Sequence, residues 1–165
     1  MKKTFLLAIS LLALSMSVTQ ATSNYHYGSY EYVTIAKGVS PDGKHAITAH
    51  GGGPYGYEHF HIYLTDAITG KKIGPLEEIV ETLDTRAEAF CAYWTPDSGL
   101  VAITYRISRH EPLKTVTYRV ASRRAYLISG PENATDEQVR FWQIQCSAPQ
   151  PSERVFGTRK AAENF

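Results

Sequence analysis

The clearest structural signal is a tight turn between two β-rich runs, in Tyr93-Trp94-Thr95-Pro96-Asp97-Ser98-Gly99-Leu100-Val101-Ala102-Ile103. Proline presets φ for the second turn position, and Asp followed by Ser or Gly closes the turn. An earlier stretch, Val39-Ser40-Pro41-Asp42-Gly43-Lys44-His45-Ala46-Ile47, has the same pattern. Each stretch predicts a β-hairpin.

These two hairpins belong to a longer internal repeat. Three further landmarks recur at an offset of about 55 residues: Ala46-Ile47-Thr48 as Ala102-Ile103-Thr104, Tyr63 as Tyr118, and Gly74-Pro75 as Gly130-Pro131. Landmarks that recur in the same order predict a duplicated sheet unit. We place its copies at about residues 36–75 and 91–131.

The remaining patterns predict a single β domain over residues 22–146. Period-two or β-rich runs predict these strands: Tyr25–Ile35, Lys44–His50, Glu58–Thr65, Ala89–Trp94, Leu100–Ile107, Thr115–Ala121 and Ala125–Ile128. Thr135-Asp136-Glu137-Gln138 is typical of a capping box and predicts a helix through about Cys146. Residues 76–89 have a helical composition, but their place between the repeats suits a strand and a loop equally well. We expect residues 147–165 to form a loose tail.

Both hairpin stretches resemble the inner hairpin of a β-propeller blade of the WD40-like or TolB-like kind. A closed propeller needs at least about four blades, and a chain of this length holds two such units. The resemblance therefore implies an all-β fold: an open antiparallel sandwich of two propeller-blade-like units, with a short C-terminal helix. Such sheets have edge strands, through which a homodimer could form.

The N-terminus has the pattern of a cleavable export signal. Lys2 and Lys3 precede the apolar run Thr4–Leu14, and Thr19-Gln20-Ala21 fits a small-x-small cleavage site. We predict a signal peptide over residues 1–21 and a periplasmic mature protein, the alternative being an N-terminal anchor helix. No other apolar run is long enough to span a membrane.

The net charge and the two cysteines bear on the kind of partner and on the compartment. The formal net charge is +1, from 17 basic and 16 acidic residues, so no strong field favours nucleic acid or anionic lipid. In an oxidising compartment Cys91 and Cys146 are expected to form a disulfide. That bond would close a loop of about 55 residues and stabilise the fold by about 4 kcal/mol. Two separate buried thiols are the alternative.

Two loops carry the candidate binding residues. The segment Arg106–Lys114 is longer than a hairpin requires, and it gathers Ser108, Arg109, His110 and Glu111 at a loop tip. The corresponding loop of the first unit is glycine-rich and displays Tyr55 and Tyr57. Tyr and Arg are frequent hot-spot residues in interfaces, so we predict a target-binding surface where both loops meet at one end. The competing interpretation is a solvated hairpin tip and ordinary strand packing.

A histidine group offers a weaker metal hypothesis. His59 and His61 alternate along one predicted strand, and His50 lies on the strand before it. Three histidines on a sheet can bind zinc, although polar residues on a solvated face explain the same spacing. The G-x-G-x-x-G pattern at residues 51–56 is followed by a predicted strand rather than a helix, which argues against a dinucleotide site and favours a flexible loop. We expect no cofactor.

The small size, the export signal and the blade-like sheets are similar to those of periplasmic inhibitors of peptidoglycan hydrolases. These comprise inhibitors of invertebrate-type lysozyme and immunity proteins against amidases delivered by type VI secretion. The resemblance implies a non-enzymatic protein that inserts Ser108-Arg109-His110 into the active site of a cell-wall hydrolase. The Ser-Gly-x-Tyr signature of some lysozyme inhibitors is absent after Ser98-Gly99 and Ser129-Gly130.

Two alternatives from other classes stay open. One is a metal-dependent periplasmic hydrolase that uses His50, His59 and His61. The other is an envelope protein-interaction module that docks on a larger assembly.

Overall fold

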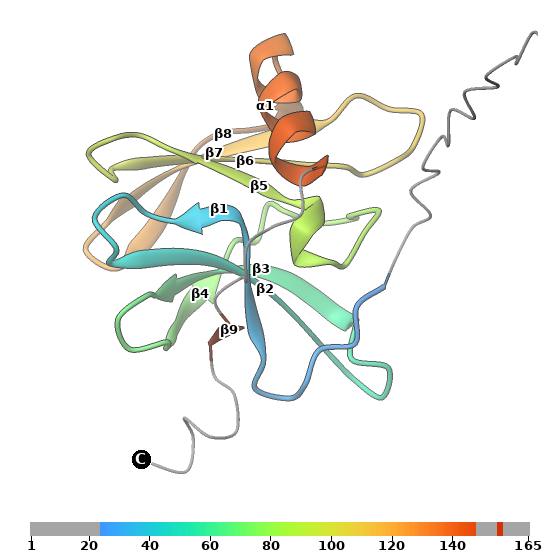
Figure 1. Ribbon diagram of the computed structural model, residues 1–165, viewed down its shortest axis with the longest axis vertical. Helices are drawn as coiled ribbons and strands as arrows, with labels where there is room; N and C mark the ends of the chain where they lie inside the picture. The colour runs from blue at the N-terminus through green and yellow to red at the C-terminus, as the bar shows by residue number, and fades with distance from the viewer. Residues whose placement is uncertain (1–23, 148–154, 157–165) are drawn as a thin grey trace, which may run out of the picture.

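The computed structural model describes residues 24–147 and 155–156, which form one curled β-sheet with a helix on its outer side (Figure 1). The predicted signal peptide at 1–21 and most of the predicted tail lie outside these residues. The elements in chain order are β1 (Tyr32–Val39), β2 (His45–Gly52), β3 (Glu58–Asp66), β4 (Lys72–Pro75), the 3-10 turn η1 (Ala87–Ala89), β5 (Cys91–Trp94), β6 (Leu100–Tyr105), β7 (Lys114–Ala121), β8 (Arg124–Asn133), α1 (Asp136–Ser147) and β9 (Val155–Phe156).

Two four-stranded meanders make up the sheet. The strand order is β4-β3-β2-β1-β5-β6-β7-β8, and neighbours within each meander are antiparallel. The meanders join where β1 and β5 pair in parallel, at Ala36 and Cys91. The all-β prediction with a short C-terminal helix is confirmed, and the parallel seam is an addition to it. The seam arises because residues 76–90 cross back and lead the chain into β5 in the direction of β1.

The same kind of hydrogen bond holds the first turn of each meander. Ser40 Oγ donates to Asp42 Oδ1 at 2.7 Å, and Thr95 Oγ1 donates to Asp97 Oδ1 at 2.6 Å. These hydroxyl donors are the main reason that the pKa values of both aspartates are lowered. The Asp42 N–H also donates to Ser98 Oγ at 3.1 Å, which ties the two turns together.

One hydrophobic core lies between the meanders. Equivalent residues of the repeat enter it, for example Ile47 and Ile103, which are both buried. On the opposite face of each meander, two buried threonines are hydrogen-bonded to each other. The distances are 2.8 Å between the hydroxyls of Thr48 and Thr65, and 2.9 Å between those of Thr104 and Thr115. Because alternate residues face opposite sides, the period-two pattern places the isoleucines inside and the threonines on the other face.

Helix α1 covers the outer face of the second meander. Its capping box is formed as predicted: the Thr135 N–H donates to Gln138 Oε1 at 2.8 Å, and the Gln138 N–H donates to Thr135 Oγ1 at 3.3 Å. Trp142 is buried and its indole N–H donates to the Ala89 carbonyl at 3.1 Å. Burial of this indole holds the helix against the sheet.

Two predicted boundaries at the ends of the domain are wrong. Strand β1 begins at Tyr32 rather than at residue 25, because the Glu31 N–H donates to the Gly28 carbonyl at 3.0 Å and turns the chain. Within the expected loose tail, β9 pairs with β1 through Tyr32–Phe156 and Val33–Val155. Figure 1 shows β9 beside the N-terminal part of β1. Strand β4 was also not predicted, since its four residues are too few to show a periodicity.

The predicted disulfide is not formed in the structure, where Cys91 and Cys146 are free thiols. Cys91 on β5 and Cys146 on α1 nevertheless belong to one small cluster with Trp142 and Leu113, where α1 packs on the sheet. The pKa of the Cys146 thiol is raised, mainly by a hydrogen bond with Cys91 and secondly by burial. The structure therefore shows two thiols in one cluster, and the disulfide between them stays a prediction.

Candidate binding surface

The two predicted binding loops lie at the same end of the molecule. Because β1 and β5 are parallel, β2 and β6 also run in the same direction, and the loops that follow them leave from the same end. Figure 1 shows both on the right of the view, the β6–β7 loop above and the β2–β3 loop below. We define the loop end as the β2–β3 loop (53–57), the β6–β7 loop (106–113) and the two segments that connect these loops in space, 24–31 and 76–90.

The β2–β3 loop presents a pair of stacked tyrosines. The ring centroids of Tyr55 and Tyr57 are 6.0 Å apart with an interplanar angle of 23°, and Tyr55 is 63% exposed. The loop is closed by Gly53, whose carbonyl accepts from the Gly56 N–H at 3.1 Å. Gly53 has a φ of 77°, and a Cβ there would collide with the Glu58 side chain, so this position requires glycine.

The β6–β7 loop presents the predicted polar tip. Arg109, His110 and Glu111 are exposed, and the His110 N–H donates to Ser108 Oγ at 3.2 Å. At the base of this loop the Arg106 guanidinium lies 5.0 Å from the centroid of the Trp142 ring, which ties the loop to α1. The tip is therefore accessible while its base is held.

A chain of hydrogen bonds connects the two loops through segments that the sequence did not assign to the site. The Tyr27 N–H donates to the Gly56 carbonyl at 3.1 Å, and the Tyr27 hydroxyl donates to the Thr85 carbonyl at 2.7 Å. In the same linker, the Leu83 N–H donates to the Arg106 carbonyl at 2.8 Å. The N-terminal segment 24–31 and the linker 76–90 thus complete the loop end.

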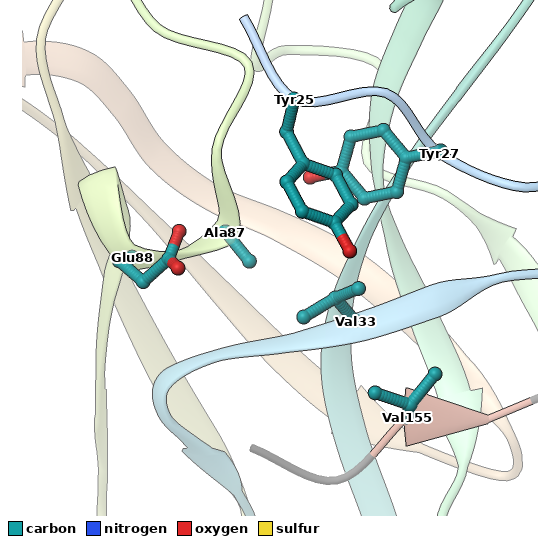
Figure 2. A pocket seen from close by; sticks show the side chains of 6 residues that line it. All are labelled: Tyr25, Tyr27, Val33, Ala87, Glu88 and Val155. Carbon is teal, nitrogen blue, oxygen red and sulfur yellow. The ribbon is translucent and has the colours of Figure 1, made fainter. Parts of the chain in front are cut away.

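A half-open cavity of about 230 Å³ lies beside these segments (Figure 2). It is lined by Tyr25, Tyr27, Val33, Ala87, Glu88 and Val155. Glu88 forms an ion pair with Arg86 at 3.2 Å, and the Tyr25 hydroxyl donates to Glu31 Oε1 at 2.8 Å.

Sequence patterns did not reveal this cavity, because its lining comes from four separate segments. The available signal was Gly28-Ser29, which interrupts the tyrosine-rich run that was predicted as a strand.

The three candidate metal-ligating histidines are not gathered around one point. His50 and His61 are cross-strand partners, whereas His59 is exposed, has a φ of 52° and lies where the register of β2 and β3 shifts. Among residues 24–147 and 155–156, no three His, Cys, Asp or Glu side chains form a group that could hold a metal ion.

His50 is held instead by a hydrogen bond and by ring stacking. Its Nδ1–H donates to the Glu31 carbonyl at 2.7 Å, and its ring stacks on Tyr32 with centroids 4.4 Å apart. Burial lowers the pKa of His50, so the neutral imidazole persists at neutral pH.

Both terminal strands of the sheet carry features that oppose strand pairing. Strand β4 is short and ends at Pro75, and β8 contains Pro131 and two register shifts. An ion pair of 3.3 Å between Arg123 and Asp66 also joins the β7–β8 and β3–β4 turns. A homodimer through these edges therefore has no support in the geometry. In the described part of the chain, every helix is too short or too polar to cross a membrane.

Comparison of the chain with protein-family models, with curated proteins and with solved structures finds no match.

Proposed function

We propose that this protein is an exported inhibitor that binds a peptidoglycan-degrading enzyme and blocks its active site with the loop end. The observation that carries the proposal is the placement of two accessible loops of complementary chemistry at one end of a cross-braced sheet. Stacked aromatic rings supply contact area, and a protruding Ser-Arg-His tip supplies hydrogen-bond donors and acceptors.

The bracing makes tight binding physically reasonable. Hydrogen bonds from Tyr27 and Leu83 link the two loops, so little loop entropy is lost when a partner binds. Inhibition would be steric, since the tip would occupy the cleft that a glycan or peptide strand normally enters. Arg109 and His110 would then lie close enough to pair with catalytic carboxylates of the enzyme.

The cell-wall target is supported by the predicted export signal and by the resemblance to periplasmic inhibitors. Peptidoglycan hydrolases act in that compartment, and their clefts are lined by carboxylates or a metal site. A tip with Arg and His complements a carboxylate-lined cleft electrostatically.

The test uses the chain without residues 1–21, assayed against an amidase and against invertebrate-type and chicken-type lysozymes. Clearing of a peptidoglycan suspension reports the hydrolase activity, and calorimetry reports the stoichiometry. We expect one enzyme class to be inhibited at a one-to-one ratio. The proposal is overturned if none is inhibited and none is captured from periplasm by the immobilised protein. Turnover of peptidoglycan by the metal-free protein alone would equally overturn it.

A further inference from the structure

Strand β9 occupies the edge of β1 that faces away from β2. On the side away from β2, β1 pairs with β5 only at Ala36, because the two meanders diverge from there. The N-terminal part of that edge pairs with β9 at Tyr32 and Val33. An edge of this kind presents backbone donors and acceptors to any extended segment.

The hold of β9 on this edge is slight. It contributes two residues to the ladder, and Val155 is 43% exposed. Phe156 adds one contact on the first meander, since its ring lies against Gly70 in the β3–β4 turn.

The cavity beside Val155 has room for a side chain larger than valine. Val155 and its partner Val33 both line it, and Figure 2 shows the two side chains next to each other. The volume is about 230 Å³. A protein cavity of about 150 Å³ can hold a benzene molecule, so this one has room for an aromatic side chain. Tyr25, Tyr27 and Ala87 provide aromatic and apolar lining on the opposite side, and the Glu88 carboxylate lies beside Ala87.

We propose that the β1 edge and this cavity bind an extended segment of a partner protein that carries a large apolar or aromatic residue at the position of Val155. Strand β9 is the built-in competitor for that site. Pairing with β1 supplies affinity, and the cavity selects the side chain, as in other cases of β-strand addition. This site shares Tyr25, Tyr27 and Ala87 with the loop end but does not include the Ser108–Glu111 tip, and the proposal does not depend on the inhibitor function.

The test uses the full chain without residues 1–21 and fluorescent peptides as probes. One peptide has the sequence of residues 152–158, a second has Phe in place of Val155, and a third has Asp in place of both Val155 and Phe156. The protein variants are Phe156→Asp, which weakens the docking of β9, and Phe165→Asp as the matched control in the same tail.

A tethered strand competes at an effective concentration in the millimolar range. We therefore expect Phe156→Asp to bind the first peptide at least tenfold more tightly than the wild type or Phe165→Asp does. On the same variant the Phe-containing peptide should bind about tenfold more tightly again, because it fills the cavity. The Asp-containing peptide should not bind. Hydrogen exchange should show protection of the Tyr32 and Val33 amides on peptide binding.

Equal affinity of the first two peptides would overturn the role of the cavity, and no binding to Phe156→Asp would overturn the site itself. A wild-type dimer that Phe156→Asp abolishes would assign the edge to the tail of a second copy, which also overturns the proposal. If Phe156→Asp does not fold, the measurement moves to Val155→Phe in the full chain. This variant should raise the melting temperature relative to the exposed control Val80→Phe, and failure to do so counts against the cavity.

Discussion

Replacing Ser108, Arg109 and His110 together by Ala should weaken inhibition strongly while leaving the fold intact. The Arg109 and His110 side chains are exposed, and Ser108 Oγ takes part in one hydrogen bond of 3.2 Å with a backbone N–H in the same loop. Losing such surface groups changes the free energy of unfolding by about 0.5 kcal/mol or less. An interface arginine at a hot spot contributes about 2 kcal/mol to binding, which corresponds to roughly a 30-fold change in Kd.

The assay pairs an inhibition titration with thermal unfolding of the same samples. A matched control replaces Arg140 and Gln143 by Ala, since these residues are also exposed and lie on α1 rather than in the loop. Like the loop variant, the control removes one arginine and no acidic residue, so it corrects for net charge. We expect unchanged inhibition and an unchanged melting temperature for the control.

Full inhibition by the loop variant would refute the assignment of the β6–β7 loop. A large drop in its melting temperature would refute the reasoning in a different way, because it would mean that the tip contributes to the fold. In that case the stacked tyrosines of the β2–β3 loop would become the primary contact, and Tyr55→Ala would be the variant to test.

Three further outcomes follow from the packing. Burial raises the pKa of Tyr105 from 10.0 to about 12, so its proton is retained by the folded chain and lost by the unfolded chain in that interval. The contribution of Tyr105 to the unfolding free energy is complete below pH 10 and is lost as the pH rises to about 12. Urea midpoints of the wild type should therefore fall over that range, and those of Tyr105→Phe should fall less steeply. Oxidation should join Cys91 to Cys146 and raise the unfolding free energy by about 4 kcal/mol. Thiol labelling with and without reductant would detect the bond. A urea midpoint that does not change when reductant is added would contradict it. Gly38→Ala should lower the unfolding free energy by about 1–3 kcal/mol, because the added Cβ would lie 2.6 Å from the Ile47 carbonyl oxygen. Gly74→Ala is the control, since a Cβ there meets nothing within 4 Å. Equal urea midpoints for the two alanine variants would exclude the clash.

Local chemistry explains which parts of the fold were predicted correctly. The turns at Pro41-Asp42 and Pro96-Asp97 formed as expected because their hydrogen bonds join residues a few positions apart. The same holds for the N-terminus of α1, where the side chains of Thr135 and Gln138 satisfy backbone donors in the first turn. The candidate loops were placed correctly as connections between strands, since their glycine and polar residues interrupt the β-rich runs.

The all-β class, the two hairpins and the capped helix can be read from the amino-acid sequence, because each depends on residues close together in the chain. The pairing of β1 with both β5 and β9 is visible only in the folded chain, and it places the two loops at one end and opens a cavity beside Val33. These features depend on backbone pairing between segments far apart in the chain, such as Tyr32 with Phe156. Such pairing leaves no periodic signal in the sequence, since any extended segment offers the same backbone donors and acceptors.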